Sequence, residues 1–309
     1  MGFKLALPAP APGALQRTGA KLRAWWNGEA YDPAAVETAP AGEGHPAADF
    51  AEDPAHAALV AGEALWGAGR LVPGDETLDL SFGSALGMTK GKRLASFGPD
   101  LGARAVLAAQ QLQVKADQFA DDPLVQAAIQ STFAGTKKLA KDLSVHLFDG
   151  APGSVPKGKA DGALFYLAAP RPDVAEALAF TAERVLRPGG SGLLFDLFAR
   201  RDDDPLINPC RGPEQRQFLD EDAVCAALEA AGLEVRGQED RGADLLNAWQ
   251  EATDRVRHDF EDFQALLLQT GGQHAAAAAL QDIMVWRARA DALRAGRLTA
   301  RRIMFHRPK

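Results

Sequence analysis

Between Arg93 and Glu239, short apolar runs alternate with longer stretches that have helical periodicity. Neighbouring parallel strands need a crossover connection of a dozen or more residues, and that connection is usually a helix. The alternation is therefore typical of an α/β domain, in which helices cover both faces of a doubly wound, mostly parallel sheet. Strands are predicted at Arg93–Phe97, Gln113–Ala116, Ser144–Phe148, Gly162–Leu167, Gly192–Leu197 and Glu234–Glu239.

Helices are predicted within this alternation and on both sides of it. They span Ala55–Leu65, Glu76–Leu86, Ala103–Gln111, Pro123–Phe133, Asp173–Leu186 and Glu221–Ala231. Two longer segments, Asp244–Gln269 and His274–Ala295, are predicted to form a helical cap, and Leu298–His306 to return as a last strand at the sheet edge. We therefore expect an N-terminal helix with an extended connector (residues 1–54), an α/β core (55–243), and the cap with the final strand (244–309).

The composition is that of a globular protein. Of the 309 residues, 47% are hydrophobic and 24% are charged, so the chain can bury a conventional core. The formal net charge of -7 argues against nucleic acid as a partner, because non-specific binding to it needs a basic surface. Cys210 and Cys225 are too few and too far apart for a metal clip or a disulfide framework, which favours a reducing, cytoplasmic compartment.

The N-terminal region is not predicted to cross a membrane. No apolar run reaches a spanning length, and Met1–Pro12 lacks the continuous apolar stretch of a signal peptide. The segment Leu15–Trp26 has basic residues beside apolar ones and is predicted to be an amphipathic helix. Contact of this helix with a membrane surface is one interpretation, but packing of Trp25 and Trp26 onto the following domain is favoured.

The most informative run joins a predicted helix to a predicted strand through a glycine turn. It reads Ala182-Glu-Arg-Val-Leu-Arg-Pro-Gly-Gly-Ser-Gly-Leu-Leu-Phe-Asp-Leu197, and it lies between Leu147-Phe-Asp-Gly-Ala151 and Leu228-Glu-Ala-Ala-Gly-Leu-Glu-Val235. Together, in this order, these motifs closely resemble the class I S-adenosylmethionine-dependent methyltransferases over most of the chain. The resemblance implies a Rossmann-like fold, S-adenosylmethionine as cofactor, and methyl transfer to a small-molecule or lipid-like acceptor.

The loop after the first predicted strand departs from this family. The family pattern is acid-x-Gly-x-Gly-x-Gly, whose glycines let the backbone approach the methionine part of the ligand. The corresponding run is Ser96-Phe-Gly98-Pro-Asp100-Leu-Gly102, so Ser96 replaces the acid and Asp100 replaces the middle glycine. An aspartate there adds bulk and negative charge beside the ligand's carboxylate. Alternatively, Asp100 pairs with the ligand's amino group, or it only caps the next helix.

The resemblance also implies an acid that accepts the two ribose hydroxyls. Asp117 directly follows the second predicted strand, about twenty residues beyond Gly98, which is the offset expected of this kind of fold. Asp117 is therefore assigned to the ribose, although an exposed loop acid explains it equally well. Asp121 and Asp122 precede a proline and are interpreted as caps of the next helix.

Five further residues are assigned to the ligand by the resemblance. Asp149, with Gly150, resembles the acid that bonds the adenine amino group. Phe165 and Tyr166 correspond to residues that line the adenine and substrate mouth, although aromatic residues in strands are more often core. Trp66 begins Trp-Gly-Ala-Gly, and it stands where an aromatic-glycine segment closes over the cofactor in the branch that acts on small amines and lipids.

No catalytic base and no metal site stand out. His258 and the run Asp202-Asp-Asp204 are interpreted as solvated side chains. Two functions stay open: a methyltransferase acting on a small amine, quinone or lipid-like acceptor under the cap, and a non-catalytic pseudoenzyme that serves as a binding or regulatory module with a protein partner or another ligand in its cleft. A homodimer is a further possible assembly. A nicotinamide-dependent enzyme is a weaker third interpretation, because the loop lacks the three-glycine fingerprint.

Overall fold

The computed structural model describes residues 54–136, 139, 141–168, 174–201, 203–213 and 215–309. The predicted N-terminal helix and all but the last residue of its connector lie outside the described residues. None of the helices in the described residues is both long enough and apolar enough to cross a membrane.

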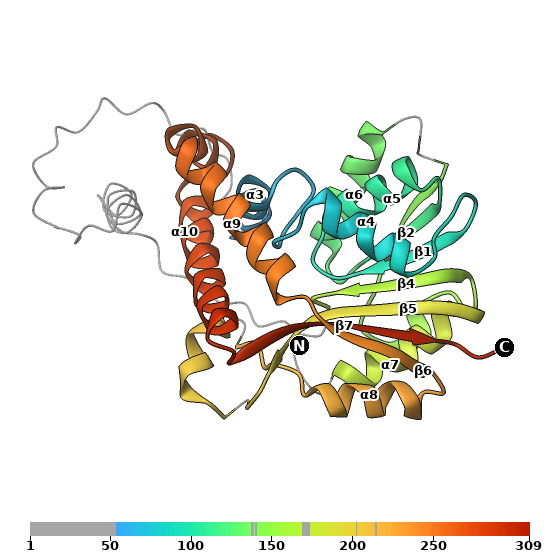
Figure 1. Ribbon diagram of the computed structural model, residues 1–309. Coiled ribbons are helices and arrows are strands. Elements are labelled where there is room, and N and C mark those ends of the chain that lie inside the picture. Colours follow the sequence, from blue (N-terminus) through green and yellow to red (C-terminus); the bar gives the residue numbers. More distant parts are fainter. Residues whose placement is uncertain (1–53, 137–138, 140, 169–173, 202, 214) are drawn as a thin grey trace, which may run out of the picture.

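The described residues form one sheet in the order β3-β2-β1-β4-β5-β7-β6 (Figure 1). The strands are β1 (Arg93–Phe97), β2 (Lys115–Ala120), β3 (Leu143–Leu147), β4 (Ala160–Tyr166), β5 (Leu186–Ala199), β6 (Glu234–Asp240) and β7 (Leu298–His306). Strands β1 to β5 pair in parallel, whereas β7 is antiparallel to both β5 and β6. The predicted fold class, a doubly wound and mostly parallel α/β sheet, is confirmed.

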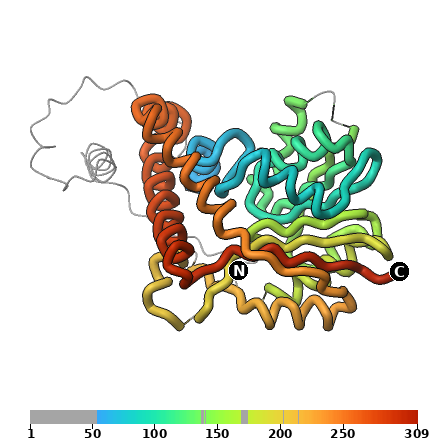
Figure 2. The backbone as a smooth tube through the Cα atoms, viewed as in Figure 1, coloured from blue at the N-terminus to red at the C-terminus, as the bar shows by residue number. Residues whose placement is uncertain are grey.

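Helices cover both faces of the sheet (Figure 2). They are α3 (Pro54–Trp66), α4 (Glu76–Ala85), α5 (Ala103–Gln111), α6 (Pro123–Gly135), α7 (Val174–Val185), α8 (Glu221–Ala230), α9 (Gly242–His258) and α10 (Phe260–Arg294), with 3-10 turns η1 (Pro152–Ser154) and η2 (Pro205–Cys210). Strand β4 shows how the alternation of side chains feeds both layers. Leu164 and Tyr166 join a core with α3, α4, α9 and α10, whereas Ala163 and Phe165 join a core with α7 and α8.

Several of these helices begin at the predicted residues, and each has an N-cap aspartate. The carboxylates of Asp75, Asp122 and Asp220 accept hydrogen bonds from amides in the first turns of α4, α6 and α8. Aspartate is favoured at this position because its side chain satisfies an amide that has no partner within the helix. The interpretation of Asp122 as a helix cap is therefore confirmed.

The last strand is not at the edge of the sheet, and in this respect the prediction is wrong. Strand β7 lies between β5 and β6. The side chains of Ile303 and Phe305 are buried, as an interior strand requires. Strand β6 has the sequence Glu-Val-Arg-Gly-Gln-Glu-Asp and is largely exposed, and charged side chains are typical of edge strands because they oppose pairing with other chains.

The helical cap breaks earlier than predicted. Helix α9 ends at His258, so the expected continuous helix Asp244–Gln269 is wrong. At Asp259 the backbone leaves the helical region, with φ -113° and ψ 39°. The expected break at the glycine pair is also present, because Gly272 has non-helical angles inside α10. The cap is thus a bent arm that packs back onto α3.

The close approach of β5 and β7 predicts a sensitive glycine. A Cβ at Gly192 would overlap the ring of Phe305, whereas a Cβ at Gly237, in β6 on the other side of β7, meets nothing within 4 Å. Overpacking of a core typically costs about 1–3 kcal/mol. We expect Gly192→Ala to lower the free energy of unfolding by about 2 kcal/mol in urea titrations. Gly237→Ala is the matched control, and equal losses in the two variants would contradict the proposed packing.

Candidate small-molecule site at the carboxyl edge of the sheet

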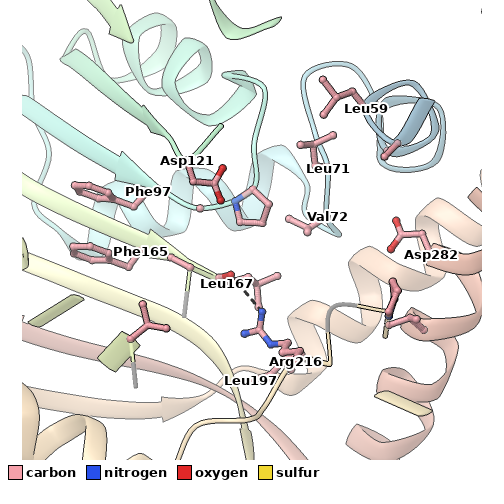
Figure 3. A pocket seen from close by; sticks show the side chains of 18 of the residues that line it. Leu59, Leu71, Val72, Phe97, Asp121, Phe165, Leu167, Leu197, Arg216 and Asp282 are labelled. Atoms are coloured by element: carbon pink, nitrogen blue, oxygen red, sulfur yellow. Dashed lines mark hydrogen bonds between the residues drawn. The ribbon is translucent and has the colours of Figure 1, made fainter. Parts of the chain in front are cut away.

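A cavity of about 760 Å³ lies where β1, β4 and β5 end (Figure 3). Its opposite wall is formed by α3, by the segment that contains Leu71 and Val72, and by α10. Ligands of open α/β sheets bind outside the carboxyl ends of the strands. This volume is also within the usual range for small-molecule sites.

The cavity wall is mainly apolar and has two groups of polar residues. Asp121 and Asp149 lie where β2 and β3 end, whereas three of the four residues in the second group belong to the cap helix α10. That second group consists of Arg216, Gln281, Asp282 and Arg289. The guanidinium of Arg216 forms an ion pair with the buried Asp196 and donates to the carbonyl oxygen of Leu167 over 3.5 Å. Such a wall suits a small molecule with a large apolar part.

Asp117 does not stand at the end of a strand, so its predicted position is wrong. Strand β2 begins at Lys115, because Gln113 turns the backbone into the left-handed region with φ 54°. Asp117 therefore lies within β2, in register with Ala95 of β1. Its carboxylate accepts hydrogen bonds from Arg93 over 2.7 and 2.9 Å and lies 3.5 Å from His146. It is not among the residues that line the cavity.

Asp121 occupies the position that was assigned to Asp117. It follows Ala120, the last residue of β2, and lines the cavity. The interpretation of Asp121 as a helix cap is wrong, because the capping carboxylate belongs to Asp122. Asp121 was missed in the sequence because the strand was predicted four residues too short at its carboxyl end.

Asp149 and Gly150 line the cavity, as the resemblance implies. The carboxylate of Asp149 accepts a hydrogen bond of 2.9 Å from the amide of Ala151 at the start of η1. This bond, helped by the Ser154 hydroxyl, holds the pKa of the carboxyl below its usual range. The side chain is thus partly committed to a local turn, while its remaining lone pairs are available to a ligand.

Gly98 and Ser96 have different surroundings. Gly98 lines the cavity, and its φ of 122° suits only glycine. A Cβ there would overlap the carbonyl oxygen of Tyr166, so packing of the loop on β4 is enough to explain the glycine. Ser96 is buried in β1, away from the cavity lining, and its hydroxyl has no hydrogen-bond partner in the described residues.

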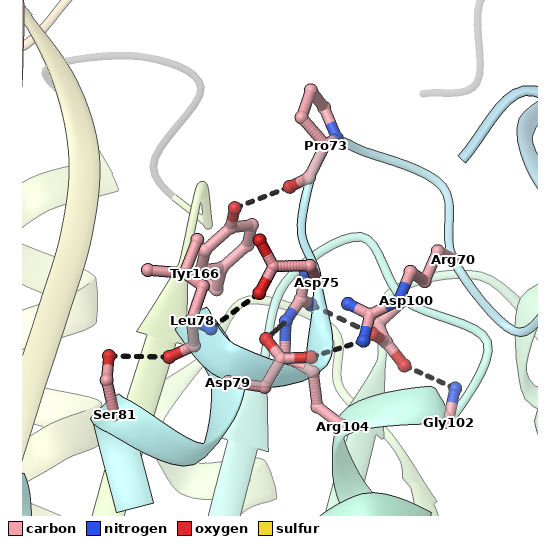
Figure 4. A network of polar contacts seen from close by, with 10 residues as sticks. All are labelled: Arg70, Pro73, Asp75, Leu78, Asp79, Ser81, Asp100, Gly102, Arg104 and Tyr166. Atoms are coloured by element: carbon pink, nitrogen blue, oxygen red, sulfur yellow. Dashed lines mark hydrogen bonds and ion pairs between the residues drawn. The ribbon is translucent and has the colours of Figure 1, made fainter. Parts of the chain in front are cut away.

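Asp100 lies in a buried network of charges and not in the cavity wall (Figure 4). Its carboxylate is 2.9 Å from the guanidinium of Arg104, which is in turn 3.0 Å from Asp79. Asp79 also pairs with Arg70 over 2.6 Å. Burial raises the pKa of the Asp100 carboxyl, while Arg104 and Arg70 oppose that rise. The interpretation of Asp100 as a helix cap is wrong, because Gly102 is the N-cap residue of α5; the Asp100 carboxylate instead accepts a hydrogen bond of 2.5 Å from the amide of Gly102, in the loop before the helix.

Of the two predicted aromatic residues in β4, only Phe165 lines the cavity. Phe165 stacks on Phe97, with ring centroids 4.5 Å apart. The ring of Tyr166 faces the other side of the sheet, where the Arg104 guanidinium lies 3.7 Å from its centroid. The Tyr166 hydroxyl donates to the carbonyl oxygen of Pro73 over 2.5 Å, and burial raises its pKa. Tyr166 thus packs against the charge network through Arg104.

Trp66 is buried behind the cavity wall and is not one of the lining residues. Its indole N–H donates to the carboxylate of Asp282 over 2.7 Å, and its ring packs edge-on against Trp286. Both partners belong to α10 and line the cavity. Trp66 therefore joins α3 to the cap and orients a polar wall residue, whereas closure over a cofactor stays a prediction.

S-adenosylmethionine, the cofactor implied by the resemblance, fits one end of this site and not the other. The cavity is large enough, and Asp121 and Asp149 lie where acids for the ribose and adenine are expected. At the start of α5, however, the amides of Leu101 and Ala103 donate to the carbonyl oxygen of Gly69. The amide of Gly102 donates to Asp100. Three amides at the junction of the loop and α5, where the ligand's carboxylate would be expected, are therefore already hydrogen-bonded within the chain.

The position of Asp117 predicts a role in stability. We expect Asp117→Asn to lower the free energy of unfolding by about 1–3 kcal/mol, because Arg93 then loses its charged partner. Burial of Asp117 raises its pKa, but the bonds from His146 and Arg93 outweigh this and lower it overall. Its contribution is therefore present above the ordinary aspartate pKa of about 3.9 and disappears as the pH falls through the folded-state value.

Urea unfolding of wild type and Asp117→Asn at neutral pH and in steps toward acid measures this difference. Asp121→Asn is the matched control, because Asp121 directly follows the same strand and its carboxylate does not take part in the network of Asp117. A stability difference for Asp117→Asn that grows toward acid pH would show that the sign is wrong.

No family model matches the sequence, and neither does a curated protein. Solved structures do match. Phosphoethanolamine N-methyltransferase 2 from Haemonchus contortus, in complex with S-adenosyl-L-methionine, is 14% identical with a TM-score of 0.67; the match covers 84% of this chain and 59% of that one. This chain thus spans less than two thirds of that protein.

Two shorter proteins match along almost their entire length. Geranyl diphosphate C-methyltransferase from Streptomyces coelicolor A3(2) is 15% identical with a TM-score of 0.54, and the match covers 97% of this chain and 100% of that one. The [4+2]-cyclase SpnF is 16% identical with a TM-score of 0.59, and the match covers 86% and 99%. The chain therefore has the fold of the class I S-adenosylmethionine-dependent methyltransferases.

Proposed function

We propose that this protein uses the methyltransferase fold to bind a small, uncharged and largely apolar molecule, and that it does not transfer a methyl group from S-adenosylmethionine. The observation that carries the proposal is the hydrogen bonding at the start of α5. Asp100 and Gly69 use the amides of Gly102, Leu101 and Ala103. A ligand carboxylate would have to displace these acceptors to reach the amides of Leu101, Gly102 and Ala103.

Opening that turn for a ligand is costly. Displacement of Asp100 leaves Arg104 with one carboxylate partner fewer in a region where both side chains are almost completely buried. Removing one partner of a buried ion pair typically costs about 3–5 kcal/mol. The contacts of a ligand would have to compensate for that free energy. Because about 1.4 kcal/mol corresponds to a factor of ten in the dissociation constant, the loss in affinity would be large.

The rest of the cavity supports binding of a small molecule. Its walls include Leu59, Leu71, Phe97, Phe165 and Leu197, so an apolar ligand would leave water on entering. The solved neighbours with this fold include an enzyme named as a cyclase and one bound to geranyl diphosphate. Those names support a varied use of the fold, in which the ligand is decided by the cavity wall.

Methyl transfer to a small apolar acceptor is the second candidate function. Asp121 and Asp149 favour it, because both carboxylates line the cavity at the ends of neighbouring strands. These are the groups that would hold the ribose and adenine of the donor. Neighbours with this fold contain S-adenosylmethionine or S-adenosylhomocysteine.

Calorimetry with S-adenosylmethionine separates the two functions. We expect the wild-type chain to bind the donor with a dissociation constant weaker than about 1 mM, and to release no labelled methyl group to a panel of apolar acceptors. A micromolar dissociation constant together with transfer of the label would overturn the proposal.

A substitution of Asp121 gives an independent test of the second candidate. If the donor does bind, Asp121→Ala should weaken its binding more than tenfold, because a charged acceptor of two hydroxyls is lost, at a cost of about 1.5–3 kcal/mol. Asp117→Ala is the control and should leave the affinity unchanged, because Asp117 does not line the cavity. Weaker binding in the Asp117 variant alone would restore the assignment made from the sequence.

A further inference from the structure

Four charged side chains form a buried cluster beside the cavity, and none of them lines it. Asp79 and Asp100 carry the negative charges, and Arg70 and Arg104 carry the positive ones. Each of the four residues is at most 8% exposed. The four side chains come from α4, from α5, from the β1–α5 loop and from the segment after α3 (Figure 4). With two charges of each sign, the cluster is balanced.

The cluster holds the segment after α3 against the start of α5. Arg70 forms an antiparallel bridge with Asp100 through the backbone, and its guanidinium pairs with Asp79. Leu71 and Val72, the next residues, line the cavity, as do Gly98 and Pro99. Arg70 and Asp100 themselves do not. The segment thus contributes to the cavity wall and, through the bridge to Asp100, also packs on the loop before α5.

The Asp100 carboxylate has the chemistry of a bound ligand's carboxylate. It accepts from the amide of Gly102, at the end of α5 where the helix dipole favours an anion. It also meets the guanidinium of Arg104, which is a common partner of carboxylates in binding sites. A second carboxylate at this place would add a third negative charge to a balanced buried cluster, which is unfavourable at low local dielectric.

We infer that Asp100 is a specificity determinant which fills the position of a ligand carboxylate, so that the cavity excludes molecules that carry an amino-acid end and admits counterparts that lack it. This inference rests on the proposed function, because it names the chemical class that the small-molecule site accepts. It also explains why the segment after α3 is fastened by buried charges.

Two probes, S-adenosylhomocysteine and 5′-methylthioadenosine, test directly whether the cavity excludes ligands with an amino-acid end. Both are thioethers of adenosine, and only the first carries an amino-acid end. In calorimetry with the full chain, we expect wild type to bind 5′-methylthioadenosine at least tenfold more tightly than S-adenosylhomocysteine. Affinities within threefold of each other, or a preference for S-adenosylhomocysteine, would overturn the inference.

A charge-balanced variant tests whether Asp100 causes this exclusion. Asp100→Gly combined with Arg104→Gln removes one charge of each sign and leaves Arg70 paired with Asp79. We expect this double variant to gain at least tenfold in affinity for S-adenosylhomocysteine relative to 5′-methylthioadenosine. Asp122→Gly is the matched control, because Asp122 also accepts from the amide two residues later, at the start of α6, but lies away from the cavity lining; its ratio should equal that of wild type.

Asp100→Asn covers the case in which the double variant does not fold. It removes the charge and keeps a side chain that can still cap Gly102, and it should shift the affinity ratio in the same direction by a smaller factor. If neither wild type nor any folded variant binds either probe, the inference is wrong. Binding that favours S-adenosylhomocysteine without methyl transfer defeats the inference alone, whereas methyl transfer by wild type defeats the proposed function itself.

Discussion

The ion pairs that Arg104 makes with Asp79 and Asp100 are the contacts on which the site depends. They join the first residues of α5 to α4 and to the loop that leaves β1. Arg104 also lies over the ring of Tyr166 in β4, so the same guanidinium ties the loop to the centre of the sheet. Buried charges are tolerated only when they are paired and hydrogen-bonded. The turn at the carboxyl edge is therefore held in a single arrangement.

That arrangement is the ground on which we propose that the chain does not use S-adenosylmethionine as a methyl donor. In an α/β protein of this type, a free helix start after the first strand is a ready site for an anion. Here Gly69 and Asp100 provide the acceptors from within the chain. The cavity remains, with Asp121 and Asp149 at one end and the cap at the other. A fold does not specify a function. The proposal follows from the groups that line this cavity and from the amides near the start of α5 that are already hydrogen-bonded within the chain.

Much of the architecture was predictable because it follows from local pattern. Strand β1, helix α5 and strand β7 have the bounds expected from their apolar runs and glycines. The second strand was placed wrongly because Gln113 has a left-handed backbone. A glutamine in the sequence does not indicate this conformation. That error of a few residues moved the assigned acid from Asp121 to Asp117. The position of β7 between β5 and β6 was also missed, although the charges of β6 mark an edge strand.

The sequence by itself determined the fold class, the helix caps and the presence of an altered loop, because hydrophobic period, capping residues and glycine turns act over a few neighbours. Only the tertiary structure decided what the altered loop does. Asp79, Asp100 and Arg104 are separated by up to 25 residues, and Tyr166 is farther still, so their pairing is invisible in any local pattern. Four side chains of types that usually lie at the surface are buried together here. They are paired with one another because an unpaired charge is very costly where water is excluded.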